Sequence, residues 1–312
     1  MQYIVTGGAG YIGGHLTDRL VSEGNEVMVL DDLSSGKYEN SGSRLVKVNL
    51  IDSDATGRLQ LPRKATFVHL AADPNVRSSM DNVVDHFDRD VTATLNTLEL
   101  ARRSDAKSFL FTSSSVVYGD AKKMPTPETY QLKPISNYGI FKMMSEELVE
   151  YYSRTYGIKS TSLRLANITG GRATHGIVPD FINKLRKDQK SLEILGDGKQ
   201  RKSYVYMTDL IDAIMLVISR QSSGYRVLNV GNSDSVSVNE MAGIISGEMG
   251  LKPKYVYRNE FGGRGWKGDV KVMLLDTKMI QKLGWKPSVS SSEAVRKAAS
   301  DLLDSGKPQL RH

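Results

Sequence analysis

The sequence predicts an α/β fold, a doubly wound parallel sheet with a smaller C-terminal α/β domain. Apolar, β-prone runs alternate with helical patterns from residue 2 to Leu165, which is typical of a parallel sheet with helices on both faces. Beyond Asn167, glycines and prolines break the chain into short pieces, which indicates that a second domain begins there. A length of 312 residues also exceeds the usual size of a single hydrophobic core.

Each strand of the expected sheet is an apolar run bounded by turn residues. The runs are residues 3–5, 25–30, 44–48, 66–70, 108–112, 159–165 and 226–230. Helices are expected over residues 78–102, 137–156 and 209–218, and from 292 to about 303. Because the last run returns to the sheet late in the chain, we expect discontinuous domains: residues 1–167 with about 206–231, and residues 168–205 with 232–312.

A glycine-rich turn follows the first run. Gly7, Gly10 and Gly13 have the spacing of a phosphate-binding turn between a strand and a helix. Gly7 adopts backbone angles that a β-carbon forbids, Gly10 lets the main chain approach a pyrophosphate, and Gly13 lets the helix lie close on the strand. The first N–H groups of the helix then attract the anion. Such a turn alone is a weak signal, because glycines also end ordinary strands.

Two acids strengthen this interpretation. Asp31 and Asp32 end the second run, and Asp31 follows Gly13 by 18 residues. An acid at the tip of the second strand, about 20 residues past the glycines, is where an adenosine ribose diol is held. Two carboxylates repel a 2′-phosphate, so the sequence favours NAD over NADP.

Tyr138 and Lys142 lie four residues apart on an expected helix, so both side chains leave the same face. An ammonium beside a phenol favours the phenolate, and a positively charged nicotinamide lowers the pKa of the tyrosine further. The pair therefore predicts a general base that works near neutral pH. The spacing is common on solvated helices, and it gains weight here because it follows the glycine turn, four further strands and Ser114.

Composition excludes several other classes. The chain has no cysteine, which removes disulfides and thiolate sites, and its five histidines have no pair at metal-ligand spacing, so no metal is expected. The net charge of +7 is interleaved with acids, without a basic stripe that carries aromatics, so nucleic-acid binding is not expected. No apolar run reaches a membrane-spanning length and no signal peptide precedes the first strand, so a cytoplasmic enzyme is expected.

The sequence resembles an extended short-chain dehydrogenase/reductase with a Rossmann-type NAD domain, most closely the UDP-glucose 4-epimerase family. The pieces that carry the resemblance span nearly the whole chain. They are TGGAGYIG, DDLSSGK, HLAA, FTSSSVVYG, YGIFK, LRLAN, GDGKQRKSYVY and GDV. The resemblance implies an NAD-dependent isomerase of UDP-sugars in galactose metabolism, and a homodimer that pairs through residues 78–102 and 137–156.

The resemblance also implies roles for individual residues. Tyr138 is the base, Lys142 binds the nicotinamide ribose, and Ser114 hydrogen-bonds the sugar hydroxyl. The implied cofactor contacts are Gly7, Gly10, Tyr11, Ile12, Gly13, Asp31, Asp32, Leu33, Ser34, Ser35, Gly36, Asn49, Leu50, Leu70, Ala71 and Ala72, with Tyr138 and Lys142. The implied substrate contacts are Asn167, Gly176, Ile177, Val178, Leu195, Lys202, Arg264, Asp269 and Met273, with Ser114 and Tyr138.

The implied reaction is redox-neutral. Tyr138 removes the proton of the 4-hydroxyl while a hydride leaves C4 for NAD⁺. The resulting 4-keto sugar turns about its diphosphate linkage and takes the hydride back on its other face. UDP therefore has to be held tightly and the hexose loosely.

Four positions depart from the family pattern. The helix asparagine that the family often has is Asp90, and the phosphate-binding arginine is Lys202, with Arg201 beside it. The arginine before Gly268 is Trp266, with Arg264 two residues earlier, so the cation that contacts the diphosphate is left open. A bulky tyrosine of some members is Met273, which is smaller; either the pocket accepts N-acetylhexosamines, or Met273 belongs to the core.

Other functions on this fold make different demands. A 4,6-dehydratase needs an Asp-Glu pair where this chain has Ser115 and Val116, and UDP-glucuronate decarboxylases usually have an acid there too. The alternatives that stay open are another nucleotide-sugar epimerase or dehydratase, such as a UDP-N-acetylglucosamine 4-epimerase, and a net NAD-dependent alcohol dehydrogenase. A non-catalytic nucleotide sensor would lack Tyr138 or Lys142, and both are present.

Overall fold

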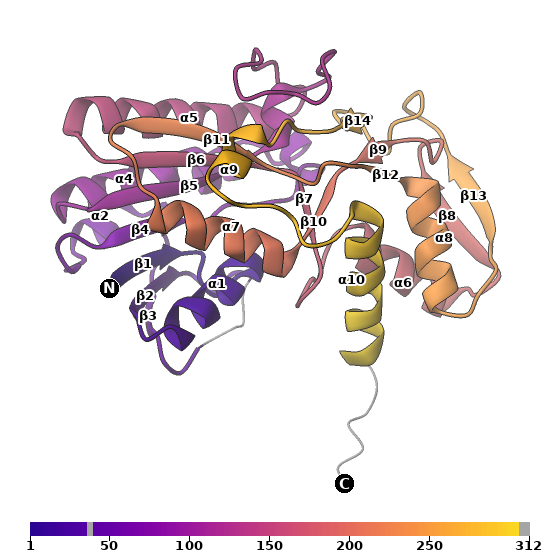
Figure 1. Ribbon diagram of the computed structural model, residues 1–312, viewed down its shortest axis with the longest axis horizontal. Helices are drawn as coiled ribbons and strands as arrows, with labels where there is room; N and C mark the ends of the chain where they lie inside the picture. Colours follow the sequence, from indigo (N-terminus) through magenta and orange to yellow (C-terminus); the bar gives the residue numbers. More distant parts are fainter. Residues whose placement is uncertain (36–39, 306–312) are drawn as a thin grey trace, which may run out of the picture. The chain divides into compact units, whose positions relative to one another are not determined.

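The computed structural model describes residues 1–35 and 40–305, and it forms two compact units (Figure 1). Unit 1 comprises residues 1–119, 131–165 and 211–228, and unit 2 comprises residues 120–130, 166–210 and 229–312. Residues 120–130, which the sequence placed with the first domain, group with unit 2. The reason is local pairing, since Thr126 forms a bridge with Leu275 and its amide donates to the carbonyl of Leu274.

The central sheet has seven strands in the order β11-β6-β5-β4-β1-β2-β3. Their bounds are β1 Gln2–Thr6, β2 Glu26–Asp31, β3 Arg44–Lys47, β4 Thr66–His69, β5 Ser108–Ser114, β6 Ser160–Leu165 and β11 Tyr225–Val230. The pairings among β1 to β6 are parallel, which confirms the predicted doubly wound sheet. β1 lies between β2 and β4, so the chain order reverses there, as it does at the ligand-binding edge of such sheets.

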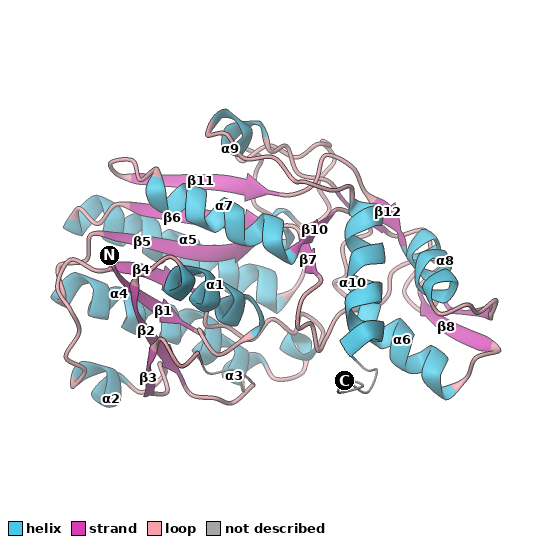
Figure 2. Cartoon of the chain, turned by 60° about the horizontal axis from the view of Figure 1, so that its bottom comes forward, coloured by secondary structure: helices cyan, strands magenta, loops and turns pink. Residues whose placement is uncertain are grey.

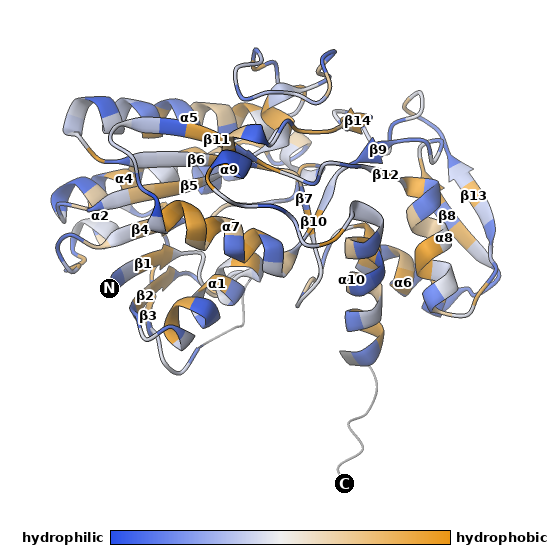
Figure 3. Cartoon of the chain, in the orientation of Figure 1, coloured by the Kyte–Doolittle hydropathy of each residue, from blue (hydrophilic) through white to orange (hydrophobic). Residues whose placement is uncertain are grey.

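Helices cover both faces of this sheet. Figure 2 shows α1 (Tyr11–Ser22) and α7 (Met207–Ser219) in front of the strands, with α4 (Ala93–Arg103) and α5 (Asn137–Tyr156) behind them. The short α2 (Ser53–Gly57) contacts α4. The core on the side of α4 and α5 combines strand and helix residues, including Ile4, Phe67, Phe109, Leu98 and Val149. The strands β1 and β2 and the helix α7 carry much of the hydrophobic colour in Figure 3, as their burial requires.

The helix expected over residues 78–102 is interrupted. It consists of η1 (Ser78–Met80), α3 (Val83–Phe87), a π-helical turn η2 (Asp88–Thr92) and α4. Asn82 has non-helical backbone angles, which ends the first piece, and the π-helical turn changes the phase of the helix that follows. Within α4, Leu95 is exposed whereas Leu98 is fully buried.

Unit 2 is a separate assembly of short strands and three longer helices. Its strands are β7 Asn167–Thr169, β8 Ser191–Leu195, β9 Arg201–Lys202, β10 Tyr204–Tyr206, β12 Val236–Ser237, β13 Lys254–Arg258 and β14 Val272–Met273. Its helices are α6 Ile177–Lys187, α8 Val238–Glu248, α9 Lys278–Lys282 and α10 Ser291–Ser305. The core of the unit lies between α6, α8 and α10, where Phe181, Ile245 and Val295 pack together.

Within the part of the chain that the structure describes, no helix combines the length and the apolar composition that a membrane crossing requires.

Candidate functional site

The residues expected to bind a cofactor gather at one edge of the sheet in unit 1. Gly7 follows β1, Asp31 ends β2, Leu70 follows β4 and Ser114 ends β5. These strands are parallel, so their carboxyl ends meet at the same edge. Gly36, one of the expected contacts, lies outside the described residues.

The glycine turn is built by backbone packing. Gly7 has a φ of 67°, and a β-carbon there would lie 2.7 Å from the backbone nitrogen of Ala71. A β-carbon on Gly13 would lie 2.0 Å from the carbonyl oxygen of Gly7, so only glycine lets α1 lie this close to the turn. Gly10 is the N-cap residue, and no side chain caps the helix. The first turn of α1, with Tyr11 and Ile12, therefore offers the helix amino terminus to an anion.

Asp31 is fixed beside this turn. Its Oδ2 accepts a hydrogen bond from the Ala9 amide at 2.9 Å, and its Oδ1 accepts one from the Leu33 amide at 2.8 Å. Burial raises the pKa of the Asp31 carboxyl, and the two backbone amides oppose that rise. Asp32 instead accepts from the amide and the hydroxyl of Ser34. An uncapped helix terminus and an oriented carboxylate at the neighbouring strand end together fit the pyrophosphate and ribose of NAD.

The remaining expected cofactor residues lie in the loops of the same edge. The Asn49 side chain accepts from the Ile51 amide, whereas the side chain of Leu50 belongs to the core and its carbonyl accepts from Asn96. Leu70, Ala71 and Ala72 follow β4, and Ala71 packs against Gly7.

A buried chain of side chains, which the sequence did not suggest, joins these strand ends. His69 Nδ1 lies 2.6 Å from Thr6 Oγ1, and His69 Nε2 lies 3.0 Å from Thr94 Oγ1. Burial lowers the pKa of His69 to about 3, with the charge of Lys142 adding to the effect, so the ring is neutral. Thr6 Oγ1 also accepts from the amide of Leu70. The chain therefore fixes the ends of β1 and β4.

Tyr138 and Lys142 occupy the first turns of α5, whose N-cap Ser136 accepts from the Gly139 amide. The Lys142 Nζ donates to the Thr112 carbonyl at 3.1 Å and lies 5.6 Å from the centre of the Tyr138 ring. The Tyr138 hydroxyl hydrogen-bonds the side chain of Ser114 at the end of β5. The structure thus brings these three predicted catalytic residues together.

The charges around this group differ from the expectation. Burial raises the pKa of Tyr138, the Asp90 carboxylate adds to that rise, and the hydrogen bond with Ser114 opposes it. Burial lowers the pKa of Lys142, while Asp90 and Glu146 oppose that fall. The sequence predicted that Lys142 would lower the pKa of Tyr138. In the structure the ammonium is directed at the Thr112 carbonyl, and burial is the largest influence on the pKa of Tyr138, which it raises.

Unit 2 brings together four of the expected substrate residues around β9 and β14. Lys202 Nζ lies 2.6 Å from Asp269 Oδ1 and 5.4 Å from the centre of the Trp266 ring. The Asp269 side chain is 4% exposed, and its other oxygen accepts from the Gly265 amide. Met273 pairs with Lys202 in parallel register and is buried. Leu195, at the end of β8, lies near Gly265.

Two arginines of unit 2 have different partners. Arg264 donates to both carboxylate oxygens of Asp120, at 3.1 and 2.7 Å, and to the Asp269 carbonyl. Arg201 instead donates to both carboxylate oxygens of Glu240 and to the Ser235 carbonyl, at the amino terminus of α8. Lys202 and Arg264 therefore both contact Asp269, whereas Arg201 is held elsewhere.

The other expected substrate residues lie on neighbouring elements. Asn167 begins β7, and its amide donates to the Ser203 carbonyl next to Lys202. Gly176 is the N-cap residue of α6, with a φ of 100° and no side-chain cap, and Ile177 and Val178 form the first turn. The amino terminus of α6 is thus a second uncapped helix end among the expected ligand contacts.

Sequence reasoning missed Asp120 and Gln200. Asp120 orients Arg264 across 144 positions of sequence, which no local pattern reveals. Gln200 is buried and donates to the Leu195 carbonyl. It lies within the motif GDGKQRKSYVY, and this position in the motif is the one sequence feature that could have indicated its role.

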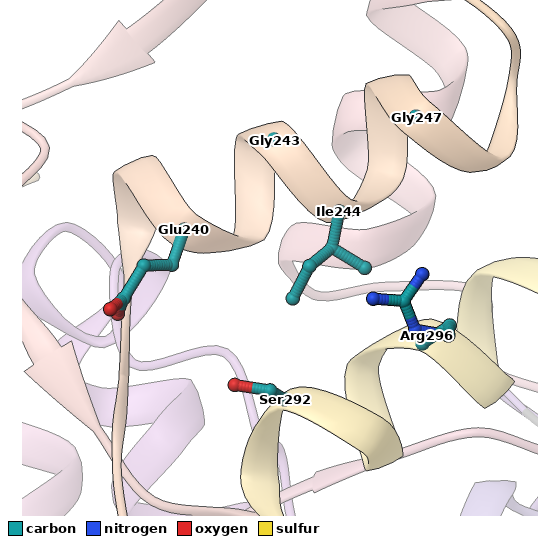
Figure 4. Close-up of a pocket in the computed structure, with 6 residues that line it drawn as sticks. All are labelled: Glu240, Gly243, Ile244, Gly247, Ser292 and Arg296. Carbon is teal, nitrogen blue, oxygen red and sulfur yellow. The ribbon is translucent and has the colours of Figure 1, made fainter.

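A pocket between α8 and α10 contains none of the expected residues. It is lined by Glu240, Gly243, Ile244, Gly247, Ser292 and Arg296 (Figure 4). Its charged groups have partners, since Glu240 binds Arg201 and Arg296 binds Glu248. Both charged side chains that line the pocket are therefore held in ion pairs, and neither is assigned a role as a general base.

The chain is similar to proteins of one family. The pattern of the NAD dependent epimerase/dehydratase family matches residues 3–231. A UDP-glucose 4-epimerase of Mycolicibacterium smegmatis is 32% identical, over 95% of this chain and 97% of that protein. A crystal structure of a UDP-galactose 4-epimerase is 40% identical with a TM-score of 0.89, and one of a Thermotoga maritima UDP-glucose 4-epimerase with UDP-glucose is 32% identical with a TM-score of 0.90. Each similarity covers 98% of this chain and 100% of the other.

Proposed function

Because the chain belongs to the NAD dependent epimerase/dehydratase family, as a UDP-glucose 4-epimerase-like isomerase, we propose that it interconverts UDP-glucose and UDP-galactose. The change of configuration takes place at C4, through a transient 4-keto sugar. The observation that carries this proposal is the group of Tyr138, Ser114 and Lys142 at the edge where the glycine turn and Asp31 lie. A phenol that can ionise, with a hydroxyl and an ammonium beside it, is a group that can take and return the proton of a secondary alcohol.

The residues of unit 1 act on the 4-hydroxyl. NAD, held by the glycine turn and Asp31, would supply a reversible hydride acceptor for C4 of the sugar. Ser114 holds the sugar oxygen by a hydrogen bond, and Tyr138, as the phenolate, takes the proton of that hydroxyl and later gives it back to the same oxygen. Lys142, as the ammonium, binds the cofactor ribose, and its charge lies 5.6 Å from the centre of the Tyr138 ring. The proton is thus returned to the sugar, so the reaction has no net release of a proton.

Unit 2 supplies the groups that hold UDP. We assign the diphosphate to Lys202 and Arg264, which share Asp269 as a partner, and not to Arg201, whose guanidinium is bound by Glu240. A lysine neutralises a phosphate as a point charge, whereas an arginine adds a planar fork. Asn167 and the uncapped amino terminus of α6 are assigned to the same nucleotide. A hold on the nucleotide alone leaves the hexose free to turn.

An elimination reaction lacks its acid and base. Ser114 is followed by Ser115 and Val116 in a buried 3-10 turn, where the expulsion of water needs an Asp-Glu pair. The Ser115 hydroxyl does not ionise near neutral pH and the Val116 side chain has no exchangeable proton, so neither supplies the acid or the base of an elimination. This supports epimerisation over dehydration.

The experiment is to incubate the purified protein with UDP-galactose and separate the nucleotide sugars. We expect UDP-glucose, without net formation of NADH; net NADH would instead favour an alcohol dehydrogenase, and no conversion would overturn the proposal. Tyr138→Phe should lower turnover by about 10²-fold or more, since general-base catalysis contributes about that factor. NAD retention should be nearly unchanged, which separates lost chemistry from lost binding.

Met273 bears on which sugars are accepted. It is smaller than the tyrosine of some relatives, and its side chain is 7% exposed on β14 beside Lys202. We propose that the enzyme also turns over N-acetylhexosamines. UDP-N-acetylgalactosamine should be converted, and Met273→Tyr should reduce that conversion more than the conversion of UDP-galactose. No turnover of the N-acetylated sugar by the unaltered enzyme would end the idea.

We also propose a homodimer. Exposed apolar side chains lie on three helices of unit 1, and those of α5 recur on one stripe. They are Val83 and Val84 on α3, Leu95 on α4, and Ile140, Met144 and Tyr151 on α5. α4 and α5 pack beside each other, so these side chains offer one helical surface to a second copy. We propose, in addition, the cytoplasmic location that the sequence analysis expected.

A further inference from the structure

Asp90 has an unusual environment for a carboxylate. The residue is 1% exposed, and neither carboxylate oxygen has a hydrogen-bond partner at ordinary distance and angle, although the backbone of Asp73 lies close enough to lower the pKa of the carboxyl. It lies in the π-helical turn η2, and such turns are frequent at functional sites. A buried charged group without strong partners is costly, so its presence requires an explanation.

The turn that carries Asp90 packs against the catalytic segment of α5. Ser145 Oγ, less than one turn after Lys142, donates to the Asp90 carbonyl at 3.3 Å. The rings of Phe87 and Phe141, just before these two residues, meet edge to face at 5.5 Å. These two contacts join the turn that carries Asp90 to the segment of α5 that carries Lys142.

Titratable groups on three further elements interact with Asp90. Lys142 and Tyr138 face it from α5, His86 from α3, and Asp73 from the loop after β4. His86 Nε2 lies 3.5 Å from Asp73 Oδ2 and 2.9 Å from the Ser78 hydroxyl, so it has partners of its own.

Two other titratable groups approach the same region and are already engaged. Glu146, one turn after Lys142 on α5, is bound by Arg164. His69 on β4 is neutral, because burial lowers its pKa. Lys142 is therefore the cation that interacts most strongly with the Asp90 carboxylate.

We propose that Asp90 is a positioning residue for the catalytic pair, a fixed negative charge that holds Lys142 as the ammonium and restrains the ionisation of Tyr138. This rests on the role proposed above for Tyr138. Asp90 reaches the sugar through neither a hydrogen bond nor a proton transfer, and it acts only through the charges of the other two residues. An asparagine, with the same shape and no charge, would lack this function.

The direction of the effect follows from the charges. An ionised Asp90 raises the pKa of Tyr138 and opposes the fall in the pKa of Lys142 that burial causes. Removing the charge lowers both pKa values. The acidic limb of the activity, which reports the phenol, and the alkaline limb, which reports the ammonium, then both move to lower pH.

The first experiment compares the pH profiles of kcat/KM for the unaltered enzyme, Asp90→Asn and Asp88→Asn. Asp88 lies in the same turn, accepts from Thr92, and loses the same charge, which makes it a matched control. We expect both limbs of Asp90→Asn to shift by roughly one pH unit toward acid, while Asp88→Asn stays within about 0.3 unit. A superimposed profile for Asp90→Asn, or a shift of both variants alike, would overturn the proposal.

The second experiment needs no activity. Infrared spectroscopy of the holoenzyme should show the C=O band of a protonated buried carboxyl that titrates near pH 6, because burial raises the pKa of Asp90 to about 6. The band should be absent from Asp90→Asn, and Lys142→Met should raise its midpoint, since the ammonium lowers this pKa. A midpoint near the ordinary 3.8, or one that Lys142→Met leaves unchanged, would refute the coupling. An enzyme inactive on UDP-galactose would refute only the proposed reaction.

Discussion

Lys202 and Asp269 form an ion pair in unit 2, with Nζ 2.6 Å from Oδ1, although 67 positions separate them in the sequence. The pairing of β9 with β14 brings them together, since Lys202 lies opposite Met273. Asp269 is almost fully buried and also accepts from the Gly265 amide. The pair holds the lysine in the orientation in which we expect it to meet a diphosphate.

Lys202→Met should therefore affect both stability and binding. The change leaves a buried carboxylate without its cation, so the free energy of unfolding should fall by about 1.5–3 kcal/mol, and KM for UDP-galactose should rise. Arg201→Met is the matched control, because its pair with Glu240 is exposed, and it should lose at most about 1 kcal/mol. Urea unfolding and steady-state kinetics measure both. Equal effects of the two variants would contradict the assignment of the diphosphate to Lys202.

Gly13→Ala should disrupt the phosphate-binding turn. The added β-carbon would lie 2.0 Å from the Gly7 carbonyl oxygen, which is backbone and cannot move aside without opening the turn. We expect the affinity for NAD to fall at least about tenfold, or about 1.4 kcal/mol. Gly57→Ala in α2 meets no atom within 4 Å and should change stability by less than about 1 kcal/mol with normal NAD binding. Normal NAD affinity in Gly13→Ala would show that the turn does not bind the cofactor.

Asp90 should make stability fall as pH rises. Its pKa is about 6 in the folded chain against an ordinary 3.8. A carboxyl whose pKa is higher in the folded chain than in the unfolded chain stabilises the fold when it is protonated. This contribution of about 3 kcal/mol is fully present below about pH 4 and is lost as pH rises through about 6. Asp90→Asn lacks this dependence, so its advantage over the unaltered protein should grow by about 1–2 kcal/mol between about pH 5 and about pH 8. Denaturant unfolding at the two pH values measures it, and a constant difference would contradict the burial of an ionised carboxylate.

Leu95→Lys should weaken the proposed dimer. Leu95 is 39% exposed on α4, and a lysine there would place a charge within an apolar interface. Sedimentation velocity should show a dimer for the unaltered protein and a lighter species for the variant. Val256→Lys, at a side chain of similar exposure on β13, should leave the mass unchanged. A monomeric unaltered protein, or an equal effect of both changes, would contradict the proposed surface.

The sequence by itself determined the central sheet and most of one catalytic group. The runs over residues 44–48 and 108–112 became β3 and β5, because apolar β-prone runs between turns are local signals. The helix of Tyr138 and Lys142 spans the predicted residues 137–156, and the distance between these side chains follows from helical geometry. Such features depend on neighbours in sequence.

Tertiary structure decided what lies between distant parts of the chain. The bond from Arg264 to Asp120, the chain from Thr6 through His69 to Thr94, and the burial of Asp90 all join separate elements. The pKa of Tyr138 shows the same limit, since the spacing predicts an activating lysine, whereas the direction in the folded chain depends on desolvation. Burial and long-range charge are properties of packing, and no local pattern of residues encodes them.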